Sequence, residues 1–261
     1  MKKLIALVLA LCLSLGLSIA MADETFKMGI DAEYPPFSYL DDNGEYAGFD
    51  VEMCKAVCDM LDWNLEIVPV NWDTKLISLD NKEHDCVWSG MTILDSMKEA
   101  GYVLSFPYYD NTQVVLTKEG NGIASLADLA GKRVAVQLGT SGASLLEEGG
   151  DLADLGKSFS SISLLGSFNL CFKELEGGAA DAVFVDLPVA EKYLQDHSEL
   201  KMLDEKLGAE EYGICFRSGE EELCKKIEDA VAELVASGKY AEIAANYPDI
   251  VDNLLFLRNA E

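Results

Sequence analysis

The chain has 261 residues, of which 49% are hydrophobic and 25% are charged, and its formal net charge at pH 7 is −26. This length is enough for one large or two small domains with cores of their own. A surface of such strong negative charge repels nucleic acid and anionic lipid, so we expect neither as a partner. We interpret the large number of acidic residues as a feature that keeps the protein soluble rather than one that selects a cationic ligand.

The N-terminus has the layout of a secretory signal peptide, with two lysines near the start, an apolar run over residues 4–17 and an A-M-A tripeptide that ends at Ala22. We predict that residues 1–22 are a signal peptide and that cleavage follows Ala22. A transmembrane anchor is the weaker alternative, because the run is shorter than the roughly 20 residues that span a bilayer. We therefore expect a soluble mature chain that is periplasmic or extracellular.

Strand-like and helical segments alternate along the rest of the chain, which is typical of parallel sheets covered by helices. The first series comprises strand 26–31, helix 50–61, strand 65–70, helix 74–79, strand 85–88 and a helix that begins at Asp95. The second series comprises strand 113–117, helix 125–129, strand 133–137, helices 141–148 and 169–175, strand 182–185 and helix 187–195. Helices 220–236 and 240–245 follow. Two α/β units of similar make-up predict two lobes.

Six cysteines follow the predicted signal peptide: Cys54, Cys58, Cys86, Cys171, Cys215 and Cys224. Cys54 and Cys58 lie on the apolar face of the predicted helix 50–61. We interpret most of the six as small core residues, and one disulfide stays open as an alternative, with no pairing deducible. His84 and His197 are far apart in sequence and are expected on the surface or in loops, so no metal site is predicted.

Residues 89–98 contain a candidate ligand-binding turn. The run Asp85–Trp88 fits a buried strand, Ser89 and Gly90 interrupt it, and a predicted helix follows. Such a turn would leave backbone amides and the Thr92 hydroxyl free for a ligand. The alternative is an ordinary loop between a strand and a helix.

Seven sequence blocks, distributed over the chain after residue 23, resemble the polar amino-acid-binding proteins of ABC importers, a family of periplasmic solute-binding proteins. In chain order they are DAEYPPF (31–37), GFDVEMCKAV (48–57), SGMTI (89–93), FPYY (106–109), GKRVAVQLGTSG (131–142), DAVFVDLPVA (181–190) and EEYGICF (210–216). Because seven blocks follow the family's order, the resemblance is specific.

The resemblance implies an α/β, two-lobed periplasmic-binding-protein fold of type II, in which each lobe is a mixed, mostly parallel sheet flanked by helices. It implies that lobe 1 comprises residues 23–107 plus 213–261 and that lobe 2 comprises residues 113–207. The two hinge crossings would be residues 108–112 and 208–212. A hinge of two extended segments allows closure around a ligand held between the lobes.

The function implied by the resemblance is that of a monomeric, non-enzymatic receptor without a cofactor. It would close around a small polar or basic amino acid or a related amine and deliver it to the permease subunits of an ABC transporter. The alternative is an enzyme similar to cyclohexadienyl dehydratases on the same scaffold. It is disfavoured because the matched site blocks contain no histidine to serve as acid or base.

The resemblance also implies two carboxylates in the cleft, Asp31 and Asp186. Each ends a predicted strand, and the carboxyl edge of a parallel sheet is where ligands of open α/β folds bind. By resemblance, Asp186 pairs with the ligand's α-ammonium group and Asp31 meets its distal part. The alternative is that each carboxylate caps the helix or turn that follows it.

Tyr34 and Trp72 occupy the family's two aromatic positions, which implies that their rings enclose an aliphatic or cationic group of the ligand. Two prolines after Tyr34 stiffen its loop. Such contacts contribute about 0.5–2 kcal/mol. Trp88, inside an apolar run, is expected in the core, and a core position is also the alternative for Tyr34 and Trp72.

A second set of ligand contacts is implied at Gln137, Gly139, Thr140 and Ser141. A glycine and two hydroxyl residues at the start of a helix offer free amides and the positive end of the helix dipole to a carboxylate. The alternative is that these residues only cap their own helix.

The arginine that grips the ligand's α-carboxylate in the family is replaced. Counting forward from Thr92 puts Met97 at its position, whereas counting back from Tyr109 puts Lys98 there. A thioether cannot replace a bidentate guanidinium, and a lysine would act only as a point charge. If Lys98 reaches the cleft, an ordinary polar or basic α-amino acid is expected. If Met97 lines it, an amine or modified amino acid without a free α-carboxylate is expected.

Overall fold

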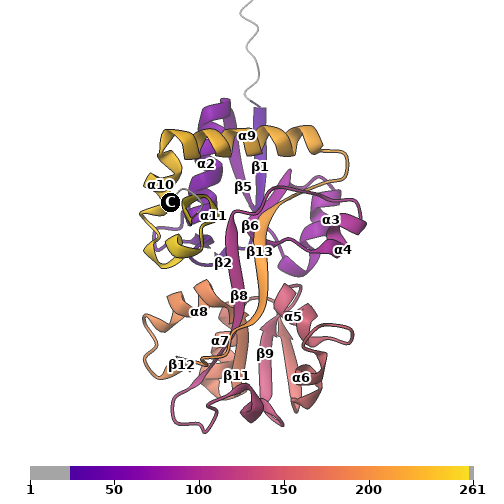
Figure 1. The fold of residues 1–261 in the computed structure, drawn as a ribbon, viewed down its shortest axis with the longest axis vertical. Helices are drawn as coiled ribbons and strands as arrows, with labels where there is room; N and C mark the ends of the chain where they lie inside the picture. Colours follow the sequence, from indigo (N-terminus) through magenta and orange to yellow (C-terminus); the bar gives the residue numbers. More distant parts are fainter. Residues whose placement is uncertain (1–23, 259–261) are drawn as a thin grey trace, which may run out of the picture.

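The computed structural model describes residues 24–258, so the predicted signal peptide and its cleavage site lie outside the described residues. Two lobes lie one above the other and are joined by two long strands that run from one lobe into the other (Figure 1). The strands are β1 (Glu24–Ile30), β2 (Glu33–Tyr34), β3 (Ser38–Leu40), β4 (Tyr46–Ala47), β5 (Trp63–Pro69), β6 (Cys86–Thr92), β7 (Val103–Leu104), β8 (Tyr109–Lys118), β9 (Arg133–Gln137), β10 (Ser161–Leu165), β11 (Ala182–Asp186), β12 (Leu200–Met202) and β13 (Leu207–Phe216).

The α-helices cover these strands in both lobes. In the upper lobe of Figure 1 they are α2 (Phe49–Leu61), α3 (Lys75–Asp80), α4 (Asp95–Glu99), α9 (Glu221–Ser237), α10 (Lys239–Ala244) and α11 (Leu255–Arg258). In the lower lobe they are α5 (Ser141–Leu146), α6 (Ala153–Ser158), α7 (Phe168–Gly177) and α8 (Leu187–Leu194). Short 3-10 helices are η1 (Trp72–Thr74), η2 (Leu126–Leu129) and η3 (Pro248–Asn253).

One curled sheet of ten strands runs through both lobes, in the order β10-β9-β11-β8-β13-β6-β1-β5, with β12 added beside β8 and β7 beside β13. The outer neighbours pair in parallel, β1 with β5 and β6, and β9 with β10 and β11. β8 and β13 are the two long strands that join the lobes, and they pair antiparallel with each other along residues Leu207 to Tyr212 of β13. The predicted α/β fold with a mixed sheet flanked by helices is confirmed, and the sheet is continuous through both lobes.

The predicted elements are present, with differences at their ends. The predicted helix 125–129 is the 3-10 helix η2. The unpredicted elements include α6, α11, β7, β10, β12, η3 and the small sheet β2-β3-β4. The interruption predicted at Ser89 and Gly90 is wrong, because β6 continues to Thr92. The last two residues of β6 pair with β13, which provides hydrogen-bond partners for their backbone groups. Because β13 is distant in sequence, residues 85–92 alone do not predict this pairing.

The cysteines lie in the core, as predicted for most of them. All six are buried with free thiols, and the one disulfide kept open as an alternative is not formed. Trp88 is buried as predicted. His84 lies in a loop, which was one of the two expected positions, but its ring is fully buried beside Gly29 and bonds Ser78 and the Cys86 carbonyl. Within residues 24–258, no helix has the length and apolar character needed to cross a membrane.

Candidate functional site

A cleft of about 570 Å³ lies between the lobes. Its upper wall is the end of β6 and the start of α4, its lower wall is α5 and the loop that follows it, and its floor is the start of β13. The lining residues are Thr92, Ile93, Leu94, Asp95, Ser141, Ser144, Leu145, Gly149, Gly150, Asp151, Gly208, Ala209 and Glu210. A narrower cavity of about 50 Å³ shares Thr92, Leu94, Ser141 and Ser144 with it and reaches Trp72 and Lys75.

Two carboxylates, Asp186 and Glu210, meet where the long strands cross between the lobes. The Asn111 side-chain amide donates to both, at 2.7 Å and 2.5 Å, and the Gln113 amide donates to both, at 2.6 Å and 2.9 Å. Asp186 precedes α8 without capping it, so the capping alternative does not account for its carboxylate. Burial first, and then the charge of Glu210, raises the pKa of Asp186 to about 7. The pair is therefore suited to accept a cation.

Asp31 connects the lobes. Its carboxylate accepts the Glu33 backbone N–H at 2.9 Å and the Gln137 amide, from the other lobe, at 2.7 Å. Ser89 supports this arrangement from below, because its hydroxyl accepts the Asp31 backbone N–H at 3.0 Å. The Gln137 side-chain oxygen is buried without a hydrogen-bond partner. Asp31 and Gln137 thus meet where the two lobes contact each other, which we call the lobe junction. Ser89 positions Asp31, and its hydroxyl is already hydrogen-bonded within the protein.

Gly90 is required by the backbone. Its φ is +53°, and an added Cβ would lie 2.3 Å from a Tyr34 ring carbon. Its N–H donates to Asp50 at 2.7 Å, so this amide is occupied within the protein. The free amide that the sequence suggested here is not found.

The two predicted aromatic contacts have different neighbours. Tyr34 bonds the Tyr212 hydroxyl at 2.6 Å, and its ring lies 6.1 Å from that of Phe168 in the other lobe. The Trp72 ring faces the Lys75 ammonium, 4.5 Å from the ring centre. Tyr34 therefore closes one side of the lobe junction with aromatic packing, and Trp72 lies at the narrow cavity that leads into the cleft.

Lys75 is a buried cation that the sequence did not identify as a site residue. Its ammonium donates to the Trp72 carbonyl at 3.0 Å and, across the lobes, to the Gly139 carbonyl at 2.7 Å. Burial lowers its pKa to about 8. Asn111 and Gln113 were also missed, although the sequence carried a signal: four consecutive polar residues, 110–113, lie near the start of β8, and the alternation of a strand places Asn111 and Gln113 on the same, buried face.

The hydroxyl residues at this site have different roles: Thr140 caps a helix, whereas Thr92 and Ser141 line the cleft. Thr140 caps α5, accepting the Ala143 N–H at 3.1 Å, as the capping alternative supposed. Ser141 lines the cleft. The Thr92 hydroxyl, from the other lobe, shares its single hydrogen between the Ser141 hydroxyl at 3.3 Å and the Glu210 carboxylate at 3.2 Å. Thr92 and Ser141 are therefore within reach of a ligand.

Met97 and Lys98 are neighbours on α4, but one is buried and the other exposed. Met97 is 4% exposed and packs in a cluster with Trp72, Val87 and Met91. The Lys98 side chain is 56% exposed and pairs with Asp95 at 3.0 Å. Lys98 is thus directed to solvent, and Met97 fills the space behind Trp72 without lining the two spaces described above.

Asp50, beneath the site, gives a testable pH dependence. Burial raises its pKa to about 7, although the Gly90 N–H and the Tyr108 hydroxyl both donate to it. The folded state thus holds this proton more tightly than the unfolded chain, so stability is lost as pH rises from about 4 towards 7. We expect the ligand-free protein to lose about 2 kcal/mol of unfolding free energy between pH 5.5 and pH 8 through this group.

Chemical unfolding of wild type and Asp50→Asn at both pH values measures this contribution. The general repulsion among acidic surface residues affects both proteins, so the difference between their pH dependences isolates Asp50. Equal pH dependences would contradict a buried proton at this position.

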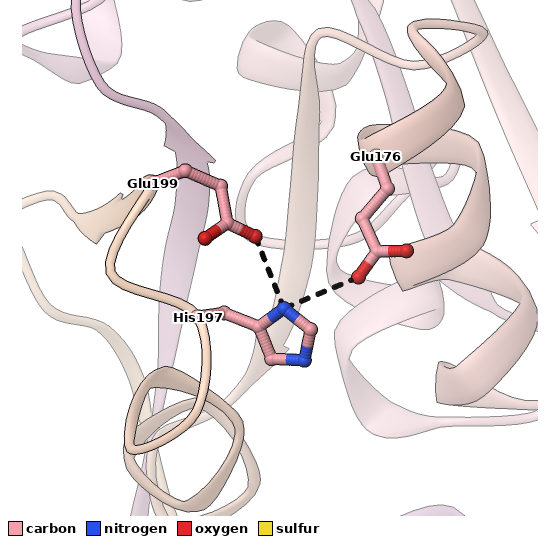
Figure 2. Close-up of side chains that lie close together, drawn as sticks. All are labelled: Glu176, His197 and Glu199. Atoms are coloured by element: carbon pink, nitrogen blue, oxygen red, sulfur yellow. Dashed lines mark hydrogen bonds and ion pairs between the residues drawn. The ribbon is translucent and has the colours of Figure 1, made fainter.

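A separate group on the lower lobe joins one histidine and two glutamates. Figure 2 shows His197 between Glu176 and Glu199, with its Nδ1 3.4 Å and 3.1 Å from their carboxylate oxygens. The imidazole also stacks on Tyr193, with ring centres 4.0 Å apart. These contacts explain the cluster as an exposed ion-pair network, and we assign it no metal.

Comparisons with known proteins agree with this architecture. Residues 26–249 match the family described as bacterial extracellular solute-binding proteins, family 3. The ABC transporter arginine-binding protein 1 of Escherichia coli (strain K12) is 30% identical over 250 residues, which cover 94% of this chain and 98% of that protein. The probable histidine-binding protein of Neisseria gonorrhoeae is 32% identical over 263 residues, covering 95% and 96%.

A solved structure shows the same fold. The substrate-binding protein of an ABC uptake transporter from Streptococcus pneumoniae, with bound histidine, has a TM-score of 0.81 and 26% identity, over 85% of this chain and 92% of that one. Both the family match and the relatives extend over nearly the whole described chain. The chain therefore belongs to the bacterial extracellular solute-binding proteins, family 3.

Proposed function

We propose that this protein is the extracytoplasmic receptor of an ABC importer, which closes around a small polar or basic amino acid or a related amine and delivers it to the permease. The observation that carries the proposal is the pair of carboxylates between the two lobes, the buried Asp186 and the half-buried Glu210, which share the Asn111 side-chain amide as donor. A carboxylate pair of this kind is a natural partner for an ammonium group. The matched family and the relatives named above are binding proteins, which supports a receptor rather than an enzyme.

The hinge and the lobes support the closure step. We propose residues 108–112 and 208–212 as the hinge, lobe 1 as residues 23–107 plus 213–261, and lobe 2 as residues 113–207. Contacts between lobes, such as Asp31 with Gln137, would have to break when the lobes open. A closed pair of lobes presents a different surface from an open pair, which is how a permease could distinguish loaded from empty receptor.

We further propose that the protein acts as a monomer, without nucleic acid or a cofactor, and after export by its signal peptide. The proposed site residues are Asp31, Tyr34, Trp72, Ser89, Gly90, Thr92, Met97, Gln137, Thr140, Ser141 and Asp186. Of these, Ser89, Gly90, Met97 and Thr140 would act indirectly, by supporting residues that touch the ligand. Lys98 is omitted because its side chain points to solvent.

Thermal unfolding with and without solutes tests the proposal. A ligand that binds only the folded state stabilises it by RT ln(1 + [L]/Kd), about 2.7 kcal/mol when its concentration is 100 times Kd. We expect a clear rise in Tm with at least one amino acid or amine. Sugars, dicarboxylates and inorganic anions serve as controls, and a Tm that responds only to these would contradict an amine-binding receptor.

A further inference from the structure

The charged side chains that line the cleft between the lobes are acidic, and this sets the charge that a ligand meets there. Among the described residues that line it, Asp95, Asp151 and Glu210 are charged and all are acidic, and none is a lysine, arginine or histidine. Of its hydroxyls, that of Thr92 is already directed to Glu210 and Ser141. A ligand carboxylate placed here would therefore face like charge.

Two buried side-chain amides leave their oxygens without partners at the lobe junction. Asn111 and Gln137 are 5% and 1% exposed, and their Oδ1 and Oε1 atoms have no hydrogen-bond partner. Their nitrogens are occupied by Asp186, Glu210 and Asp31. A buried acceptor without a donor costs about 1–3 kcal/mol, so these oxygens call for a donor from outside the chain. Ammonium and guanidinium groups supply several donors and no acceptor.

The one buried cation at the junction, among the described residues, is already engaged. Lys75 donates to two backbone carbonyls and lies against the Trp72 ring. Both carbonyls lose a charged donor if Lys75 turns to a ligand. Lys75 therefore neutralises its own surroundings and holds the lobes together rather than presenting a free charge to a carboxylate.

We infer that the solute carried by this receptor is an organic cation with no free carboxylate, such as the decarboxylated counterpart of a basic amino acid. This inference rests on the proposed function and narrows its ligand class. The positive nitrogen would lie between Asp186 and Glu210, and its remaining hydrogen would reach the unpartnered oxygen of Asn111, whose amide bonds both carboxylates. The aliphatic part would extend along Thr92 and Ser141 towards Trp72.

Calorimetric titration of the exported chain with matched pairs of solutes tests the inference. The pairs are arginine and agmatine, lysine and cadaverine, and histidine and histamine, which differ within each pair by the carboxylate alone. In at least one pair we expect the amine to bind about tenfold or more tightly than the amino acid. If the amino acid is preferred in every pair that binds, the inference is wrong and the proposed function stands. If no member of any pair binds, the inference is wrong, and the thermal-unfolding screen with the wider set of amino acids and amines decides the proposed function separately.

Two neighbouring glutamates provide a matched pair of variants. Glu210→Gln should weaken binding of the preferred amine by about 30-fold or more, because it removes one of the two charges at the nitrogen. Glu211→Gln makes the same change one residue along β13, at an exposed position on the opposite face, and should leave affinity within about threefold. In the absence of ligand, a Tm at or above that of wild type establishes that each variant folds. A Glu210→Gln protein that keeps its affinity would overturn the placement of the cation.

Discussion

Replacing Asp186 by asparagine is expected to weaken binding of the transported solute by about 30-fold or more. Truncating one partner of a buried charged pair costs about 2–5 kcal/mol, because the other charge is left buried without compensation. Asparagine keeps the size of the side chain and still accepts from Asn111 and Gln113, which now donate to the carboxylate. The loss of affinity therefore reports the missing charge rather than a change in shape.

Stability is expected to move in the opposite direction from affinity. Burial and the nearby Glu210 raise the pKa of Asp186 to about 7, so the charged form is costly in the ligand-free protein above that pH. The ligand-free Asp186→Asn protein should thus be at least as stable as wild type at pH 8. Titration calorimetry and thermal unfolding of the same samples measure both quantities. Wild-type affinity in Asp186→Asn would contradict a cation at this carboxylate.

Met97→Ala is expected to cost about 2–5 kcal/mol of unfolding free energy, and Lys98→Ala less than about 0.5 kcal/mol. Met97 is buried against Trp72 and Met91, so its truncation leaves a cavity. Lys98 loses only an exposed contact with Asp95, three residues away on the same helix. Urea unfolding of the two variants measures the difference directly.

The same two variants decide which residue took the place of the family's arginine. Met97→Leu, which preserves volume, is the control and should cost less than about 1.5 kcal/mol. Lys98→Ala should bind the transported solute as wild type does. If Lys98→Ala abolishes binding while Met97→Ala does not change stability, α4 is rotated from the orientation described here.

The alternation of strands and helices was sufficient to predict the α/β class and the order of most elements. Helix α2 is an example, since its regularly spaced apolar residues are the ones that are buried. The extension of β6 through Ser89 and Gly90 was missed because small residues at a strand end resemble a turn. The length of β6 is set by its pairing with β13, which lies more than 100 residues later in the chain, so the local sequence pattern does not predict it.

The site was predictable to the extent that it depends on strand ends. Asp31 and Asp186 were identified in this way, and each takes part in a network at the lobe junction. Glu210 and Lys75 were not assigned to the site, because their roles arise from contacts between lobes rather than from neighbours in sequence. The burial of the His84 ring was missed for a similar reason. It depends on the absence of a side chain at Gly29, 55 residues earlier in the chain.

The most direct test is a crystal structure of the protein with the tightest-binding amine from the calorimetric pairs. The predicted result is a ligand nitrogen within about 3 Å of both Asp186 and Glu210, with the rest of the molecule along Thr92 and Ser141. A ligand bound outside the space between the lobes would contradict the proposed site. A ligand whose carboxylate lies at Lys75, with that lysine turned away from Gly139, would contradict the inferred ligand class.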